Sequence, residues 1–146
     1  MSFFMEKEEN FIIIVGCGYL GLTLADSLLR QEIVIIDNKA DAFSRLPPSF
    51  EGAGIIGDAV EIFIMNEIHV EKAAAVISAT GNDNTNILVA HIAKSFYHIP
   101  YVTASLHALE RERICRELDI DIILPDRITA KVINDYLRTT VNAKGY

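Results

Sequence analysis

The sequence predicts an α/β fold in which a parallel sheet of six strands carries helices on both faces. Short apolar runs alternate with amphipathic segments along most of the chain. The apolar runs are continuous, which is typical of strands that are covered on both faces. The first of these runs leads directly into three glycines with the spacing G-x-G-x-x-G. This combination is typical of a doubly wound, Rossmann-like sheet with the strand order 3-2-1-4-5-6.

Each element follows from a local pattern. The first helix carries Leu20, Leu24 and Leu28 on one face, and Pro47 ends the second helix. We expect a flexible leader at residues 1–10 and a single domain at residues 11–146. The strands are expected at residues 11–15, 33–36, 53–56, 73–79, 101–104 and 120–124. The helices are expected at residues 19–30, 39–46, 60–67, 82–96, 107–118 and 126 to about 139.

Composition argues against several classes of partner. The 146 residues carry a formal net charge of −7 with a pI near 5.0, and Lys and Arg do not cluster. Such a chain is a poor match for nucleic acid or an anionic membrane surface. No apolar stretch approaches the roughly 20 residues of a membrane span, so we expect no direct membrane insertion. Cys17 and Cys115 have no metal or redox spacing, which favours a reduced, cytoplasmic protein.

The glycine motif predicts a binding site for a nucleotide phosphate. Gly16 lets the strand turn tightly, Gly18 lets the backbone approach a pyrophosphate, and Gly21 lets the next helix pack near the sheet. The exposed N–H groups and positive dipole end of that helix favour a phosphate. Cys17 is expected to be a small filler inside the loop. Because a helix N-terminus can lower the pKa of a thiol, redox sensing stays open as an alternative.

Acidic and polar residues follow the later strands at the same edge of the sheet. Asp37 lies 21 residues after Gly16, where a carboxylate binds ribose hydroxyls and repels a 2′-phosphate. This favours NAD or an unphosphorylated adenosine over NADP, unless Asp37 only caps the next helix. Asp58 either reaches the adenine or ribose or caps a helix. Asn82 and Asp83 either approach the ligand or cap their own helix.

The sequence has no evident acid–base constellation for catalysis. It contains no Tyr-x-x-x-Lys pair, and its four histidines are dispersed. His107 and Glu110 could form a metal or acid–base pair, but no third ligand is evident. A nucleotide site without catalytic groups favours a sensor, in which binding changes conformation or assembly. We therefore expect a protein that is not an enzyme.

Five motifs stand in a specific order along the chain, namely IIIVGCGYLGLTLADSL, IVIID, IIGDA, AAAVISATGNDNTN and DIILPDRITA. Together they resemble the RCK domain family, whose members are also called KTN or TrkA N-terminal domains. The resemblance covers residues 11–132. It implies a Rossmann domain that binds NAD(H) or an adenine nucleotide. It also implies dimers, assembled into a ring that controls a potassium channel or transporter.

The same resemblance implies the residues of the site. Many relatives have Arg where this chain has Tyr19 and Ser105. The loss of both cations makes ATP the least favoured ligand and favours NAD(H), ADP or AMP. The resemblance implies a phosphate loop formed by Gly16, Cys17, Gly18, Tyr19, Leu20 and Gly21. It implies Asp37 as the ribose acid, with Asn38 beside it, and Asp58 as the acid near the adenine. The far rim of the site would consist of Thr80, Gly81, Asn82 and Asp83.

The C-terminal part of the chain leaves two questions open. Full-length relatives commonly carry a second ligand-binding domain, which the 146 residues do not include, so we expect either a fragment or a short natural subunit. The last helix carries a broad apolar stripe. The stripe either packs on its own sheet or crosses in part to a second subunit. It consists of Ile128, Val132, Ile133, Tyr136 and Leu137.

The favoured function is a non-catalytic, nucleotide-binding regulator of a potassium channel or transporter, acting through ligand-dependent changes in assembly. We expect a homo-oligomer, a dimer or a ring of dimers, held at the inner face of the cell membrane by its partner. One alternative is an NAD-dependent oxidoreductase or its cofactor-binding half. Another is a nucleotide-linked redox sensor.

Overall fold

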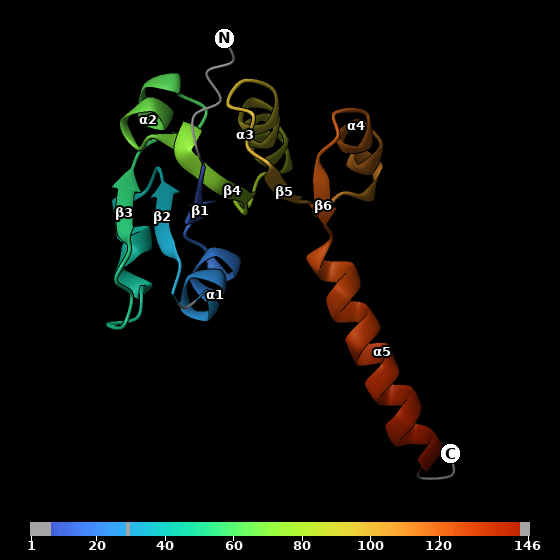
Figure 1. Cartoon of the computed structure of the whole chain (residues 1–146). Helices are drawn as coiled ribbons and strands as arrows, with labels where there is room; N and C mark the ends of the chain where they lie inside the picture. Colours follow the sequence, from blue (N-terminus) through green and yellow to red (C-terminus); the bar gives the residue numbers. More distant parts are fainter. Residues whose placement is uncertain (1–6, 29, 144–146) are drawn as a thin grey trace.

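The computed structural model describes residues 7–28 and 30–143. Its centre is one six-stranded sheet in the order β3-β2-β1-β4-β5-β6, and every neighbouring pair is parallel (Figure 1). The predicted fold and strand order are confirmed. The strands are rich in Ile and Val, whose β-branched side chains pack well on a pleated surface. The strands are β1 (Glu8–Val15), β2 (Glu32–Asp37), β3 (Ala53–Ile56), β4 (Ala73–Ser78), β5 (Tyr101–Ser105) and β6 (Asp121–Ile123).

Helices and short 3-10 segments connect the strands. The α-helices are α1 (Tyr19–Ser27), α2 (Ile62–Glu67), α3 (Asp83–Ser95), α4 (Glu112–Glu117) and α5 (Pro125–Ala143). The 3-10 segments are η1 (Ala40–Arg45), η2 (Val70–Lys72) and η3 (Leu109–Arg111). Of the predicted leader, residues 8–10 belong to β1. Residues 1–6 lie outside the described residues.

Some predicted helix boundaries are wrong for local reasons. The α-helix α1 ends at Ser27, and Arg30 has a φ of 69°, a left-handed conformation that no α-helix continues. The segment predicted as a helix at 39–46 is the 3-10 segment η1, because Pro47 leaves no length for regular turns. The helix predicted at 107–118 divides into η3 and α4. The helix α5 extends four residues beyond the predicted end near 139.

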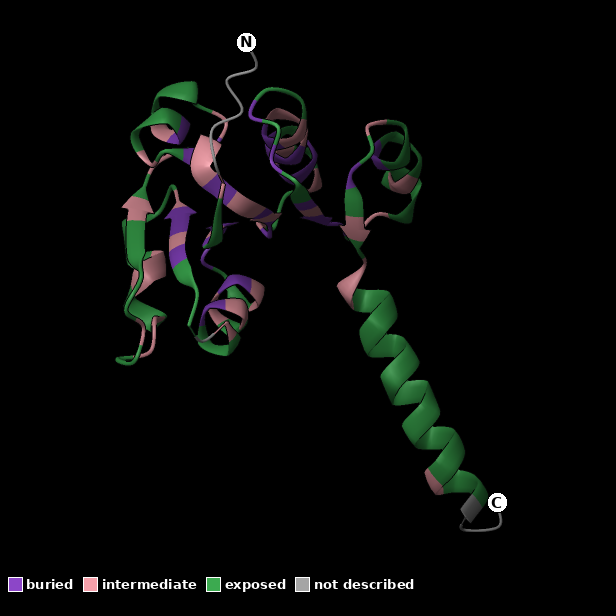
Figure 2. Cartoon of the chain, in the orientation of Figure 1, coloured by how far each residue is buried: buried purple, intermediate pink, exposed green. Residues whose placement is uncertain are grey.

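Two apolar layers hold the sheet. On one face, α2, α3 and α4 pack over a large cluster whose centre includes Ile13, Val76 and Val102 (Figures 1 and 2). On the other face, α1 and η1 cover β1 and β2 through a smaller cluster that includes Ile14 and Ile35. Within residues 7–28 and 30–143, the second layer therefore ends near β1, and β4, β5 and β6 have no helix packed on that side.

The uncovered face belongs to β4, β5 and β6. Residues paired across parallel strands share a face, and the registers pair Ile14 with Ile77 and Ile77 with Thr103. On the same face, Tyr101 is 70% exposed and Ile123 is 42% exposed. This side of the sheet is thus apolar but only partly buried.

The last helix, α5, projects away from the body of the domain (Figures 1 and 2). It begins with Pro125 and Asp126, which suit the first turn of a helix. It does not pack on its own sheet. Its apolar stripe is exposed and consists of Ile128, Val132, Ile133, Tyr136, Leu137 and Val141. Within the described part of the chain, no helix combines the length and apolar character that crossing a membrane requires.

Candidate functional site

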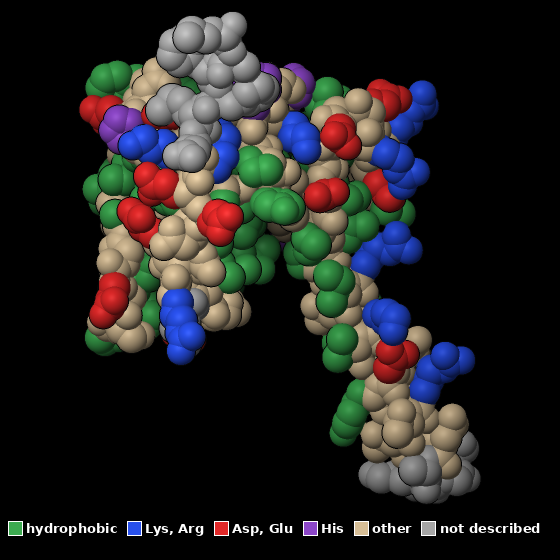
Figure 3. Space-filling view, viewed as in Figure 1, with side chains coloured by type: hydrophobic (Ala, Val, Ile, Leu, Met, Phe, Trp, Pro, Cys, Tyr) green, Lys and Arg blue, Asp and Glu red, His purple; other side chains and the backbone are tan. Residues whose placement is uncertain are grey.

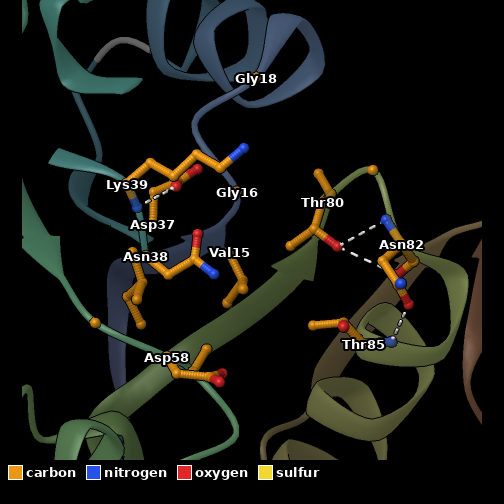
Figure 4. A pocket seen from close by; sticks show the side chains of 15 residues that line it. Val15, Gly16, Gly18, Asp37, Asn38, Lys39, Asp58, Thr80, Asn82 and Thr85 are labelled. Atoms are coloured by element: carbon orange, nitrogen blue, oxygen red, sulfur yellow. Dashed lines mark hydrogen bonds between the residues drawn. The ribbon is translucent and has the colours of Figure 1, made fainter. Parts of the chain in front are cut away.

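A cavity of about 350 Å³ opens at the carboxyl ends of the first four strands (Figure 4). It lies beside the boundary between β1 and β4, where the strand order reverses. Open α/β sheets bind ligands at this point, and the volume is in the range of small-molecule sites. The lining residues lie at or after the ends of β1, β2, β3 and β4 and in the first turn of α3. They are Val15, Gly16, Gly18, Ile36, Asp37, Asn38, Lys39, Gly57, Asp58, Ala59, Ala79, Thr80, Gly81, Asn82 and Thr85.

The three glycines of the motif have three different surroundings. Gly16 has a φ of 105°, and a Cβ there would lie 2.6 Å from the carbonyl oxygen of Ala79. A Cβ on Gly21 would lie 1.9 Å from the carbonyl oxygen of Gly16, so α1 packs directly on the loop. A Cβ on Gly18 would meet nothing within 4 Å, and Gly18 borders the cavity. The first and third glycines shape the loop, and the second leaves room beside the N-terminus of α1.

Asp37 connects the glycine loop to the end of β2. Its Oδ2 accepts a hydrogen bond of 2.9 Å from the backbone N–H of Cys17. Its Oδ1 accepts a second bond of 2.9 Å from the backbone N–H of Lys39. Each carboxylate oxygen has a further lone pair, so Asp37 can still accept a bond from a ribose hydroxyl in the cavity. The carboxylate is therefore both a structural and a potential ligand group.

The remaining acid and the far rim also carry two kinds of contact. Asp58 borders the cavity, and its Oδ1 accepts a hydrogen bond of 3.0 Å from the backbone N–H of Val60. Asn82 caps α3 by accepting a bond of 3.0 Å from Thr85 N, and its own N–H donates to Thr80 Oγ1 (Figure 4). The sequence left capping and ligand contact open at these positions. The geometry is compatible with both.

Asn86 fixes the far rim, and the sequence analysis did not single it out. The side chain is fully buried. Its Oδ1 accepts a bond of 2.9 Å from Thr80 N, and its Nδ2 donates to the carbonyl oxygens of Thr80 at 3.0 Å and Ser105 at 2.8 Å. One amide thus holds the ends of β4 and β5 together. The signal was its place in the polar run after β4, which also contains its bonding partner Thr80.

Asp83 faces a neighbouring hollow rather than the main cavity. Its carboxylate accepts hydrogen bonds from the backbone N–H groups of His107 and Ala108 at 2.8–3.2 Å. Burial opposes its ionisation, but these bonds and the charges of His107 and Arg111 outweigh burial and lower the pKa of Asp83. The hollow is lined by Gly81, Asn82, Asp83, Asn84, His107, Ala108 and Arg111. Asp83 therefore anchors the loop that follows β5.

His107 connects that loop to the base of α5. Its Nδ1 lies 3.0 Å from Oδ2 of Asp126. This hydrogen bond is the main reason that the pKa of His107 is raised; burial works against it, and the charges of Asp126 and Asp83 add to it. Both side chains are largely exposed. Among the described residues, no group of three or more His, Cys, Asp or Glu side chains could hold a metal ion.

The glycine loop contains one buried thiol and one exposed ring. Cys17 is 3% exposed, and its Sγ lies 3.4 Å from the carbonyl oxygen of Ala42. Burial, and then the charge of Asp37, raise the pKa of Cys17, so the lowered pKa considered from the sequence is wrong in direction. Tyr19 is 80% exposed, with the guanidinium of Arg45 5.5 Å from its ring centre.

The structure brings together most of the residues that the sequence proposed for the site. Those at the cavity are Gly16, Gly18, Asp37, Asn38, Asp58, Thr80, Gly81 and Asn82. Those that do not border it are Cys17, Tyr19, Leu20, Gly21 and Asp83. The sequence analysis missed the apolar lining at the strand ends, one glycine, one threonine and one cation. These are Val15, Ile36, Ala59 and Ala79, then Gly57, Thr85 and Lys39.

A parallel sheet in this order, with a glycine loop at its reversal point, defines the Rossmann class of α/β domain. The model of the TrkA-N domain family matches residues 12–125, and the chain belongs to this family. The chain is similar to the Trk system potassium uptake protein TrkA of Streptomyces coelicolor, with 31% identity over 121 residues. The match covers 82% of the chain and 54% of that relative, so the chain spans about half its length.

Solved structures share the fold. The TrkA-N domain of the inner membrane protein ybaL from Escherichia coli has a TM-score of 0.78 and 20% identity, covering 89% of this chain and 98% of that domain. The RCK domain of GsuK has a TM-score of 0.77 and 20% identity, covering 93% of this chain and 30% of that one.

Proposed function

We propose that the chain is a non-catalytic, nucleotide-binding regulatory domain of a potassium uptake or channel system. The observation that carries the proposal is the cavity between the glycine loop and the ends of β2, β3 and β4. Family membership supports the connection to potassium transport. Binding energy at this site would change conformation or assembly rather than make or break a bond. The domain would then act at the cytoplasmic face of the membrane, held there by the channel or transporter that is its proposed partner.

The proposed ligand is NAD(H), ADP or AMP. The cavity offers Gly18 beside the N-terminus of α1 for a phosphate and Asp37 for a ribose. GsuK has been solved bound to NAD and to ADP, at TM-scores of 0.70 and 0.75 to this chain. The C-terminal domain of Kef from Shewanella denitrificans has been solved in an AMP-bound form, at a TM-score of 0.77. These structures support the ligand class.

A binding panel tests the proposed site. The chain is titrated by calorimetry with NADH, NAD, ADP, AMP, ATP and NADPH, and thermal unfolding is followed in parallel. A ligand at one hundred times its dissociation constant should stabilise the fold by about 2.7 kcal/mol. Asp37→Asn should weaken binding of the favoured ligands, because it removes the charged acceptor. Asp41→Asn makes the same charge change on η1, away from the cavity lining, and should bind as the parent chain does. Absence of binding in the parent chain contradicts the proposal.

We further propose that the chain acts as a homodimer in which α5 of one copy covers a second copy. The stripe on α5 is apolar and exposed, and the face of β4, β5 and β6 beside it also carries exposed Tyr101 and Ile123. Figure 3 shows hydrophobic side chains along the edge of α5 nearest the body and on the underside of the body. In a dimer, the apolar stripe on α5 of one copy would pack on the sheet face of the other copy, so that both surfaces become buried. Dimers joined in this way could form the ring that the family resemblance implies.

The oxidoreductase alternative makes a different prediction. It requires an acid or base beside a bound nicotinamide, and the His107–Asp126 pair at the neighbouring hollow is the candidate for that role. Incubation of the chain with NADH and candidate carbonyl substrates separates the two functions. The regulatory proposal predicts that NADH binds and stays reduced, and its steady oxidation would support the enzyme instead.

A further inference from the structure

Lys39 brings positive charge to a phosphate site whose glycine loop has none of its own. The loop runs from Gly16 to Gly21 and contains no Lys or Arg. Its residue Tyr19, the first residue of α1, carries no charge that could bind a phosphate. Lys39 belongs to a different segment, two residues after Asp37, yet it borders the same cavity as Gly16 and Gly18. Among the described residues that line the cavity, the charged side chains are Asp37, Asp58 and Lys39. The two acids would repel an anionic ligand, and Lys39 opposes them.

The local structure aims Lys39 at the loop. One carboxylate, that of Asp37, accepts hydrogen bonds from the backbone N–H groups of both Cys17 and Lys39, at 2.9 Å each. The backbone positions of the glycine loop and Lys39 are therefore tied to one group. In Figure 4 the side chain of Lys39 extends past Asp37 toward the loop between Gly16 and Gly18. Within the described residues, its Nζ has no carboxylate within ion-pair distance.

We propose that Lys39 binds the phosphate attached to the 5′-oxygen of the adenosine ligand and selects phosphorylated ligands over adenosine. The inference rests on the proposed nucleotide site. The phosphate would lie beside Gly18, where its oxygens accept hydrogen bonds from N–H groups of α1 on one side and from the Lys39 ammonium on the other. A lysine ammonium is a compact charge with three donors and suits a phosphate oxygen. Asp37 remains beside the ribose hydroxyls and disfavours a 2′-phosphate.

Calorimetric titration with adenosine, AMP and ADP tests the inference on three chains: the parent, Lys39→Gln and Lys131→Gln. Lys39→Gln should weaken AMP and ADP about 10-fold, the loss expected for one exposed charge-assisted hydrogen bond, and should leave adenosine unchanged. Lys131→Gln changes net charge equally but lies on α5, and should bind as the parent does. Lys39→Arg should restore most of the lost affinity. The weakening of ADP binding by added salt should be smaller in Lys39→Gln than in the parent.

The outcomes separate this inference from the proposed function. If the parent binds AMP and ADP and Lys39→Gln binds them equally well, the site stands and the role of Lys39 is wrong. An equal loss for adenosine and ADP also overturns it, because Lys39 would then act on the nucleoside. In a further titration of the same chains with NADPH, a selective loss of NADPH binding alone would place the ammonium at a 2′-phosphate and overturn the inference as well. If the parent binds none of these ligands, the nucleotide site itself fails.

Discussion

Gly16 and Gly21 are glycines because their own backbone surroundings leave no space, whereas Gly18 borders open space. A Cβ at Gly21 would lie 1.9 Å from a backbone oxygen, which a flexible neighbour cannot relieve. Gly18 has a φ of −85° with extended ψ, a conformation that any residue adopts. The motif therefore combines two residues needed for the fold with one that borders the proposed ligand site. This division can be measured.

Gly21→Ala should lower the free energy of unfolding by about 3 kcal/mol, because the added methyl group forces α1 away from the loop. Gly18→Ala should change it by no more than about 0.5 kcal/mol, because the methyl group enters open space. Gly18→Ala should nevertheless weaken ADP binding about 10-fold, which corresponds to about 1.4 kcal/mol. Urea unfolding and calorimetry check both variants. Equal destabilisation by the two substitutions would contradict the assigned roles.

At the residue scale, the sequence predicts which side chains lie at the cavity when their position depends on spacing along the chain. It does not predict those whose position depends on three-dimensional packing. The position of Asp37 beside the cavity was predictable because this residue ends β2 at a fixed distance from the glycine loop. Lys39 was not, because a lone lysine in a loop gives no sign of where its flexible side chain will lie. Asp83 was placed near the ligand because it follows β4, but its carboxylate turns to the backbone of the next loop.

At the scale of elements, the loop after β5 and the base of α5 form one joined unit. Asp83 holds the backbone of that loop, and His107 in the loop pairs with Asp126 in the first turn of α5. Strand and helix order followed from apolar periodicity, which burial enforces. The direction of α5 did not follow, because its stripe is equally compatible with its own sheet and with a second copy. The conformation of short segments such as η1 was predicted wrongly because only a few residues determine it.

The His107–Asp126 pair predicts a measurable pKa. Because Asp126 favours the protonated ring, an NMR titration of His107 should give a midpoint above about 6.5, its ordinary value. The contribution of the pair to stability is complete below the unfolded pKa and is lost as the pH rises through the higher folded pKa. Asp126→Asn should lower the midpoint toward the ordinary value. An unchanged midpoint would show that the pair does not form in solution.

The exposed stripe of α5 predicts self-association. Tyr136 is 66% exposed in the single chain, and Tyr136→Glu should weaken dimerisation at least about 10-fold by placing a charge in the contact. Arg138→Gln is the matched control, because it changes the net charge by the same amount on the side of α5 away from the stripe. Sedimentation velocity over a range of concentrations measures both. A sedimentation profile unchanged by Tyr136→Glu argues against a dimer role for α5.

At the scale of the whole molecule, the two faces of the sheet differ in how completely they are covered. The face under α2, α3 and α4 is closed by a large apolar cluster, whereas the face beyond α1 is partly bare and α5 stands apart from it. The cavity lies at one edge of the sheet, and the hollow at the base of α5 begins at Gly81 and Asn82, which also line the cavity. A ligand in the cavity would therefore lie beside the hollow at the base of α5, the helix proposed to join two copies.

The cavity at the end of β1 is the proposed binding site for an adenine nucleotide. The most direct measurement is a titration of the isotope-labelled chain with ADP, followed by backbone amide NMR. We predict saturable shifts concentrated at residues 16–18, 37–39 and 80–82, which line or adjoin the cavity. The Lys39→Gln chain should need more ADP to reach the same shifts. Saturable shifts elsewhere, or none at millimolar ADP, AMP and NADH, would contradict the account.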